Sequence, residues 1–192
     1  SRNRIFEKRG EDLYTRAFDE SRVEDPSLIL YAPMRVLPGR VIVTNGDQTD
    51  TIAEALHAGG NFIDALMTRC YEPDEPHCTP RISALLTLSP DAYAYQLSIL
   101  KRAQLTDGCV REYFCYPGQP GAGHLIHTYA HDGNPLPSFC TEPVCVRLDT
   151  DPDRFCDLLW ESLDADNRIS LYVRWMNLKT GAVWERIVNR NV

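Results

Sequence analysis

The chain lacks a long hydrophobic run and an excess of positive charge, and each absence excludes a class of protein. Its most apolar stretch, Leu28–Met34, is far shorter than the roughly 18 residues that a membrane span needs and is broken by Pro33. Its 20 basic residues are outnumbered by 27 acidic ones, giving a formal net charge of −7. We therefore expect no membrane and no nucleic acid as partners. A small anionic ligand stays open, because two or three arginines can hold a phosphate inside an acidic protein.

Paired cysteine motifs and nucleotide fingerprints are also missing. The seven cysteines are odd in number and contain no CxxC, and the chain is long enough to fold without disulfides. The histidines and cysteines nowhere show the paired spacing of zinc ligands, so we expect no metal. No GxGxxG or GxxxxGK[ST] occurs, which excludes the common dinucleotide and P-loop sites. Free thiols and an N-terminus without an apolar leader predict a cytoplasmic protein.

Length and hydrophobic content predict one domain. A chain of 192 residues that is 43% hydrophobic can bury a substantial core, and it shows no repeat or linker. Three helical patterns, at Thr51–His57, Asn61–Cys70 and Asp153–Leu163, interrupt a series of hairpin signals. Asp50 or Thr51 is expected to cap the first helix, with Thr51 and Glu54 at capping-box spacing.

These patterns predict an α+β protein of stacked, mainly antiparallel sheets flanked by helices. The expected strands are Leu13–Phe18, Leu28–Tyr31, Met34–Leu37, Arg40–Thr44, Ile82–Leu88, Ala92–Leu100, Val110–Tyr116, His124–Tyr129, Pro143–Leu148, Ile169–Met176 and Val183–Val188.

Short polar side chains crowd the turn between the strand Arg40–Thr44 and the first helix. Asn45 and Gly46 suit a tight turn, and Thr49 follows at the helix start. Backbone N–H groups there, with the Thr49 hydroxyl, can cradle an oxyanion or a phosphate. The same residues are also typical of an ordinary turn followed by a helix cap. The pattern alone favours this second interpretation.

Several basic and aromatic residues are further candidates, each with a plainer alternative. Arg81 opens a strand after Thr79-Pro80, where an arginine projects from the sheet end or is simply solvated. Tyr31 and Arg35 share a face only if the backbone is regular through Pro33. Arg2 and Arg4 either form a fork that binds a carboxylate or phosphate or belong to a frayed chain terminus.

Together, these residues resemble the archaeal-type inosine-monophosphate (IMP) cyclohydrolase family, including its bacterial homologues. The central stretch Val41–Glu54 looks like the family's strand–NGxxTD–helix signature. Tyr31 and Arg35 lie at the matching distance before it. The other similar segments are Thr79–Ile82, Ser1–Arg4 and, as in the bacterial branch, Gly123–Tyr129.

The resemblance implies a fold and an activity. The family has a four-layer αββα sandwich similar to N-terminal-nucleophile hydrolases. It closes the purine ring by removing water from 5-formamidoimidazole-4-carboxamide ribotide to give IMP, without a cofactor. A purine nucleotide is thus the expected partner, and a homo-oligomer is an option. Residues 1–192 would form one such domain, shortened at its opening strand, and Ala32 stands where an asparagine commonly follows the tyrosine.

The resemblance also implies roles for individual residues. Ring closure needs donors to the formyl oxygen and a proton for the departing water. The expected catalytic residues are Tyr31, Arg35, Asn45 and Asp47. The expected substrate-binding residues are Arg2, Arg4, Gly46, Thr49, Asp50, Thr79 and Arg81. Eight of these are expected to share one pocket: Tyr31, Arg35, Asn45, Gly46, Thr49, Asp50, Thr79 and Arg81.

Two other functions stay open. One is an amidohydrolase of the N-terminal-nucleophile type that uses Ser1 or a cysteine. Against it, Ser1–Arg4 is too polar for the start of a core strand. The other is a non-catalytic protein that binds purine nucleotides.

The cysteine pattern gives a first prediction. Thiol titration of freshly purified, denatured protein without reductant should find all seven thiols, because nothing in their number or spacing favours a disulfide framework. A count of five or fewer contradicts it.

Overall fold

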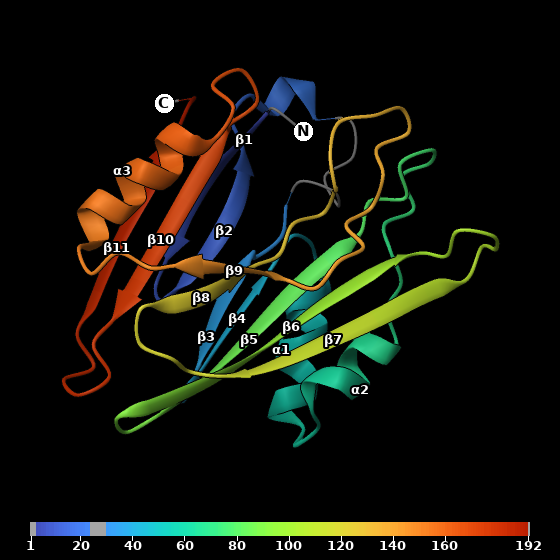
Figure 1. The fold of residues 1–192 in the computed structure, drawn as a ribbon. Coiled ribbons are helices and arrows are strands. Elements are labelled where there is room, and N and C mark those ends of the chain that lie inside the picture. The colour runs from blue at the N-terminus through green and yellow to red at the C-terminus, as the bar shows by residue number, and fades with distance from the viewer. Residues whose placement is uncertain (1–2, 24–29, 192) are drawn as a thin grey trace.

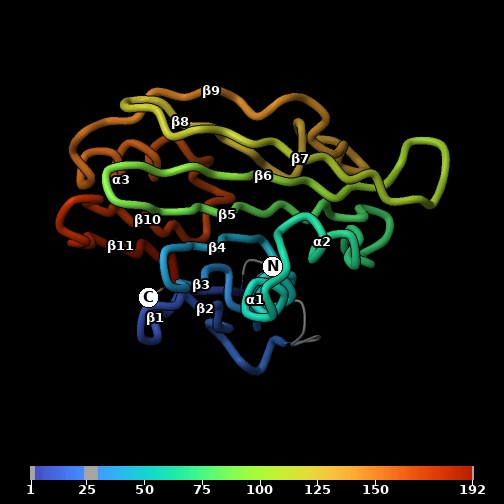
Figure 2. The backbone as a smooth tube through the Cα atoms, turned by 90° about the horizontal axis from the view of Figure 1, so that it is seen from below, coloured from blue at the N-terminus to red at the C-terminus, as the bar shows by residue number. Residues whose placement is uncertain are grey.

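The computed structural model describes residues 3–23 and 30–191 of the chain. Its largest element is a seven-stranded sheet whose strands follow one another in chain order, each antiparallel to the next (Figures 1 and 2). The α+β class and the mainly antiparallel pairing are therefore confirmed. The strands are β1 (Arg4–Arg9), β2 (Asp12–Ala17), β3 (Met34–Leu37), β4 (Arg40–Thr44), β5 (Arg81–Ser89), β6 (Ala92–Arg102) and β7 (Cys109–Pro117).

Two hairpins and three α-helices complete the described part. The hairpins are β8 (Ala122–Leu125) with β9 (Val144–Arg147), and β10 (Ser170–Met176) with β11 (Val183–Asn189). The helices are α1 (Gln48–His57), α2 (Phe62–Met67) and α3 (Pro152–Ser162), with a short 3₁₀ turn, η1 (Glu20–Arg22). Within residues 3–23 and 30–191, every helix is too short or too polar to cross a membrane.

One face of the large sheet is covered by α1 and α2. Because side chains alternate along a strand, Ile42 and Leu85 point to this face, where they pack with Ile52 of α1 and Leu66 of α2. Ile42, Ile52 and Leu66 are completely buried. This cluster is the main hydrophobic core and fixes the start of α1 against the ends of β4 and β5.

The opposite face is covered by the β10–β11 hairpin. Met34 and Val41 pack there against Tyr172, Met176 and Ile187. Helix α3 lies on the outer side of the hairpin (Figure 1), where Phe155 meets Trp175 edge-on at 5.8 Å between ring centroids. An ion pair of 2.8 Å joins Asp157 of α3 to Arg186 of β11.

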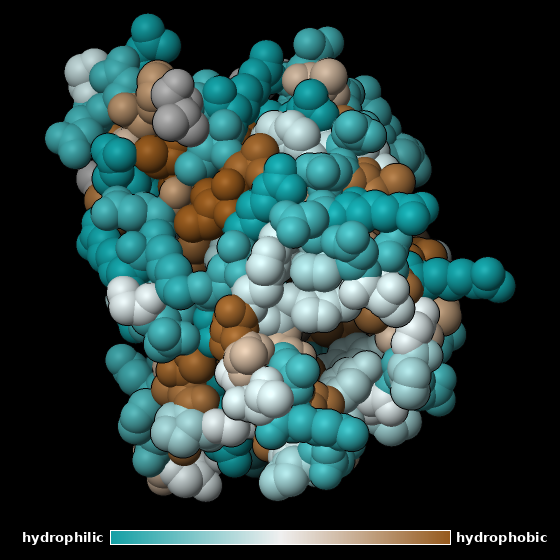
Figure 3. All heavy atoms as spheres, turned by 90° about the vertical axis from the view of Figure 1, so that its left-hand side faces the viewer, coloured by the Kyte–Doolittle hydropathy of each residue, from teal (hydrophilic) through white to brown (hydrophobic). Residues whose placement is uncertain are grey.

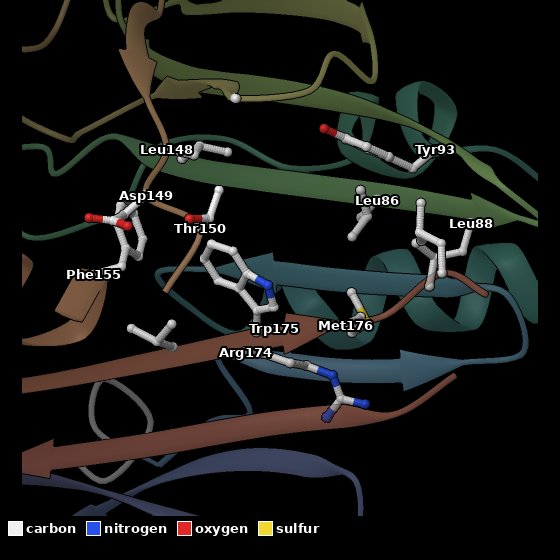
Figure 4. Close-up of a pocket in the computed structure, with 13 residues that line it drawn as sticks. Leu86, Leu88, Tyr93, Leu148, Asp149, Thr150, Phe155, Arg174, Trp175 and Met176 are labelled. Carbon is white, nitrogen blue, oxygen red and sulfur yellow. The ribbon is translucent and has the colours of Figure 1, made fainter. Parts of the chain in front are cut away.

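Packing between the large sheet and the hairpin is incomplete. A cavity of about 540 Å³ lies there, and Figure 4 shows Leu86 and Trp175 at its wall, whereas the Arg174 guanidinium points away. Figure 3, which views the side that carries α3 and this hairpin, shows hydrophobic side chains reaching the surface between hydrophilic ones. The hairpin therefore covers the sheet without sealing it.

Strand β1 corrects one expectation. We expected no strand before Leu13, yet β1 spans Arg4–Arg9. It is an edge strand, and the side-chain amide of Asn189 closes onto its backbone. The Phe6 N–H donates to Asn189 Oδ1 at 2.9 Å, and Asn189 Nδ2 donates to the Phe6 carbonyl at 3.1 Å. An edge strand that is capped in this way tolerates charged side chains.

Other expected boundaries shift. Helix α1 begins at Gln48 with Asp47 as N-cap, so neither Asp50 nor Thr51 caps it and the capping box is absent. Of the expected strand Leu28–Tyr31, residues 24–29 lie outside the described residues, and Tyr31 is not in a strand. The strand expected over His124–Tyr129 ends at Leu125. All seven cysteines are free, as expected.

The core gives a second prediction. Leu66→Ala removes a fully buried side chain of α2 and should lower the free energy of unfolding by about 2–5 kcal/mol in a denaturant titration. The matched control is Leu105→Ala, because Leu105 is 96% exposed and its loss should change that free energy by less than about 0.5 kcal/mol. Equal effects of the two changes would show that the main core is assigned wrongly.

Candidate active site

A buried arginine stands at the centre of the polar residues. Arg81, the first residue of β5, is only 8% exposed. Its Nη1 donates to Asp47 Oδ1 at 2.6 Å and to Gln48 Oε1 at 2.9 Å. Glu72 Oε1 lies 3.5 Å from the same nitrogen. A guanidinium so removed from water needs these partners, so it gathers the α1 start and the 71–80 loop around itself.

The Asn45 side chain explains why the β4–α1 turn meets the start of β5. Asn45 Nδ2 donates to the Pro80 carbonyl at 2.8 Å, and the Ile82 N–H donates to Asn45 Oδ1 at 2.9 Å. Gln48 adds a bond from Nε2 to the Ile82 carbonyl at 3.1 Å. Asn45 thus satisfies backbone groups on both sides of Arg81 and holds the turn against the start of β5.

Gly46 leaves space for the Arg81 guanidinium. A Cβ atom at position 46 would lie 2.6 Å from Arg81 Nη1 and 2.9 Å from Glu72 Oε1. The Gly46 N–H donates to Thr44 Oγ1 at 3.2 Å, and the fully buried Thr49 hydroxyl donates to the Gly46 carbonyl at 3.0 Å. Because the N–H and the carbonyl of Gly46 already bond to threonine hydroxyls, the turn supports the Arg81 cluster. Its Gly46 N–H does not serve as an anion-binding group.

The two carboxylates beside Arg81 differ in their electrostatics. Burial alone would raise the pKa of Asp47, but hydrogen bonds from Arg69 and Arg81 hold it below its usual value. Burial raises the pKa of Glu72, and the nearby Asp74 and Asp47 raise it further, against the opposing charge of Arg81. Asp47 is therefore a fixed anion, whereas Glu72 is a carboxyl group that keeps its proton more readily.

Tyr31 lies close to the same charges. Its backbone is held to β2, since the Tyr31 N–H donates to Thr15 Oγ1 at 3.0 Å. Arg4 Nη1 donates to the Tyr31 hydroxyl oxygen at 3.1 Å. Burial raises the pKa of Tyr31, with Arg4 and Arg81 lowering it and Glu72 raising it. The Tyr31 phenol is therefore neutral and lies within electrostatic reach of Glu72.

Thr79 belongs to the same region through the loop before β5. Its hydroxyl bonds Asp74 Oδ2 and lies 2.6 Å from the Tyr129 hydroxyl, while its carbonyl accepts from the Glu72 N–H at 2.9 Å. Burial raises the pKa of Tyr129, and Asp74 and Glu72 add to the rise. Tyr129 therefore brings a second neutral phenol from a distant part of the chain.

Arg35 and Asp50 form a separate cluster. Arg35 Nε donates to Asp50 Oδ1 at 2.5 Å, and its Nη1 donates to Asp12 Oδ2 at 3.0 Å and to the Tyr14 hydroxyl at 3.3 Å. The hydrogen bond to Asp50 raises the pKa of Arg35. The pair lines a cavity of about 430 Å³ with Glu54. None of the other six residues expected in one pocket lines this cavity, and no described contact joins Arg35 or Asp50 to the Arg81 cluster's side chains.

The structure thus divides the predicted residues. Contacts or mutual pKa effects join Arg4, Tyr31, Asn45, Gly46, Asp47, Thr79 and Arg81 into one group, with Thr49 beneath it. Arg2 lies outside the described residues. The sequence analysis missed Gln48, Arg69, Glu72, Asp74 and Tyr129. The sequence signal for Glu72 and Asp74 is their place in the acidic loop before Thr79-Pro80-Arg81. In the described part of the chain, no three His, Cys, Asp or Glu side chains group as metal ligands.

Comparison with known proteins bears on this geometry. The sequence model of the IMP cyclohydrolase-like protein family matches residues 1–180. The chain belongs to this family. An IMP cyclohydrolase of Methanocella arvoryzae is 37% identical over 90 residues, which are 44% of this chain and 44% of that protein. The match therefore spans less than half of the curated relative. The family membership confirms the resemblance seen in the sequence.

The close approach at Gly46 gives a third prediction. Gly46→Ala places a methyl group against Arg81, Gln48 and Glu72 and should lower the free energy of unfolding by about 1–3 kcal/mol, measured in a denaturant titration. Gly108→Ala is the control, because its Cβ would approach only the Thr106 hydroxyl, at 3.1 Å. If the Gly46→Ala variant is as stable as the control, a methyl group fits beside Arg81 without strain and the close approach is assigned wrongly.

Proposed function

We propose that this protein is an IMP cyclohydrolase, which closes the purine ring of 5-formamidoimidazole-4-carboxamide ribotide with loss of water, or hydrolyses IMP in reverse. The observation that carries the proposal is the buried Arg81 cluster in a chain that belongs to the IMP cyclohydrolase-like family. The name of the Methanocella relative supports the same substrate. The reaction would serve purine biosynthesis, and a purine nucleotide would be the partner.

The chemistry requires stabilisation of one oxygen and delivery of one proton. As the carboxamide nitrogen attacks the formyl carbon, the formyl oxygen gains negative charge, which the Tyr31 hydroxyl is suited to meet as a donor. That oxygen must then leave as water. Glu72 is our candidate for its proton donor, because burial raises its pKa, and Tyr31 is the second. Asp47 contributes by holding Arg81 in place.

Substrate binding is the second part of the proposal. Arg4, with Arg2 beyond the described residues, is a candidate for the ribose phosphate. Arg81 already bonds Asp47 and Gln48, so we propose that it positions Glu72 in addition to attracting the anion. Thr79 and Asn45 shape the same wall. Arg35 and Asp50 would act from the neighbouring cluster, at the first turn of α1.

We also propose that residues 1–192 form one αββα domain of the N-terminal-nucleophile hydrolase type. The support is the order of the contacts: α1 and α2 on one face of the large sheet, the β10–β11 hairpin on the other, and α3 beyond it. Ser1, the nucleophile of the amidohydrolase alternative, lies outside the described residues. A non-catalytic nucleotide-binding protein differs by binding IMP without turnover.

A fourth prediction tests the roles of Tyr31 and Glu72. Ring closure of the formylated ribotide, followed by ultraviolet absorbance, should proceed with the parent and slow by roughly 10²-fold or more in Glu72→Gln. The parent rate should fall as pH rises through the Glu72 pKa, because only the protonated acid donates. That dependence should vanish in Glu72→Gln. Tyr31→Phe should lower turnover with little change in IMP affinity, since that contact strengthens only as charge develops.

Glu161→Gln is the matched control, because Glu161 is an exposed acid of α3. It should keep the rate and the pH profile of the parent. If Glu72→Gln and Tyr31→Phe retain full turnover, their assigned roles are wrong. If the parent binds IMP but never closes the ring, the protein is a nucleotide-binding protein and the proposed activity fails.

A further inference from the structure

Three side chains from two distant segments form a continuous series of hydrogen bonds beside Glu72. The Thr79 hydroxyl donates to Asp74 Oδ2, and the Thr79 N–H donates to Asp74 Oδ1 at 2.6 Å. The Tyr129 hydroxyl lies 2.6 Å from the Thr79 hydroxyl oxygen. All three residues are half-buried, and the Thr79 carbonyl accepts a hydrogen bond from the Glu72 N–H at 2.9 Å. We call Tyr129, Thr79 and Asp74 the relay.

The Asp74 carboxylate fixes the direction of the hydrogen bonds in the relay. An ionised carboxylate only accepts hydrogen bonds, and a threonine hydroxyl has a single hydrogen to donate. Because the Thr79 hydrogen points to Asp74, the Tyr129 hydroxyl must donate its hydrogen to the Thr79 oxygen. Toward a ligand, the Tyr129 oxygen is therefore an acceptor that has no hydrogen of its own to offer.

Ring closure requires an acceptor of this kind. The attacking carboxamide nitrogen carries two protons and must lose one of them as it bonds to the formyl carbon, since it would otherwise keep a positive charge. The Asp47 carboxylate is engaged by Arg69 and Arg81 and does not supply this acceptor. The Glu72 carboxyl group is the proposed proton donor. Asp74 is therefore the carboxylate that can receive the proton.

We propose that Tyr129 is a catalytic residue, which takes the proton from the attacking nitrogen and passes its own proton through Thr79 to Asp74. As the new N–C bond forms, one N–H bond breaks and its proton moves to the Tyr129 oxygen. The Tyr129 proton moves to the Thr79 oxygen, and the Thr79 proton moves to Asp74 Oδ2. Glu72 gives its proton to the formyl oxygen, so the addition product is neutral. This inference rests on the proposed function.

The relay explains how a phenol can accept a proton here without ionising. Burial raises the pKa of Tyr129, so the phenol alone is a poor base. Within the relay it gains one proton as it loses another and stays neutral throughout. The end of the relay is also held in place, because the Asp74 carbonyl accepts from the His77 N–H at 3.0 Å and from the Cys78 N–H at 3.3 Å. Such fixed geometry favours proton transfer.

The first test breaks the relay at its two hydroxyl groups. Tyr129→Phe and Thr79→Val should each slow ring closure by roughly 10²-fold or more, followed by ultraviolet absorbance. Thr79→Ser restores a hydroxyl and should close the ring at least about tenfold faster than Thr79→Val. Valine shares the branched shape of threonine and serine does not, so a role in packing alone would give the opposite order.

The second test reverses the direction of the relay. In Asp74→Asn the new amide nitrogen donates to the Thr79 oxygen, which turns the Thr79 hydrogen toward Tyr129 and the Tyr129 hydrogen toward the ligand. IMP carries a hydrogen at N1, whereas AMP carries a lone pair there. Ring closure should therefore slow by roughly 10²-fold. The preference for IMP over AMP, measured as the ratio of their dissociation constants, should fall by about tenfold.

Asp107→Asn is the matched control, because the Asp107 side chain is 87% exposed and lies outside the relay. It should keep the rate and the nucleotide preference of the parent. If the parent closes the ring and Tyr129→Phe or Asp74→Asn keeps its rate, the relay is wrong while the proposed function stands. An unchanged preference in folded Asp74→Asn overturns the relay as well. If Asp74→Asn does not fold, Tyr129→Phe decides, since it leaves both bonds between Thr79 and Asp74 in place. If the parent never closes the ring, the proposed function fails and takes the relay with it.

Discussion

The burial of the Arg81 guanidinium constrains everything around it. A permanent charge with so little access to water is tolerated only with several partners, and these come from two separate segments: Asp47 and Gln48 at the start of α1, and Glu72 in the loop before β5. The small turn residue Gly46 is required because any side chain would enter the space of the guanidinium. The hydrophobic core below, with Ile42, places β4 beside β5 so that these contacts can form.

The burial of Arg81 also gives the two carboxyl groups beside it, Asp47 and Glu72, different protonation tendencies. Asp47 is shared by Arg69 and Arg81, so its charge is neutralised and its position is fixed. Glu72 is in longer contact with Arg81 and its burial is less compensated, which keeps a proton on it at higher pH. Two neighbouring carboxyl groups thus acquire opposite tendencies from their surroundings, as acid and base residues do in many enzymes.

Much of the fold was predictable because the large sheet is built from neighbours in sequence. The hairpin through Pro38-Gly39 and the strands that follow Arg81 are local patterns of alternating side chains. Strand β1 was not predictable, because its charged residues are acceptable only at an edge that the distant Asn189 covers. In the site, the turn residues Asn45 and Gly46 were visible. Tyr129 lies in the similar segment Gly123–Tyr129, but no local pattern pairs it with Thr79, 50 positions away. The pairing of Arg35 with Asp50 also depends on how α1 packs, which no local pattern gives.

The chain-order arrangement of the large sheet has a consequence for how the molecule reaches its structure. Each of its strands pairs with its predecessor, so the sheet can grow by successive hairpins. The connections are short except between β2 and β3 and at the α1–α2 insertion between β4 and β5. Docking of β10–β11 is different, since the bond between Phe6 and Asn189 joins nearly opposite ends of the chain. Contacts of such sequence separation form slowly, because the entropy of closing the loop is lost before they are made. Folding should therefore end with the C-terminal hairpin closing over a sheet that already exists.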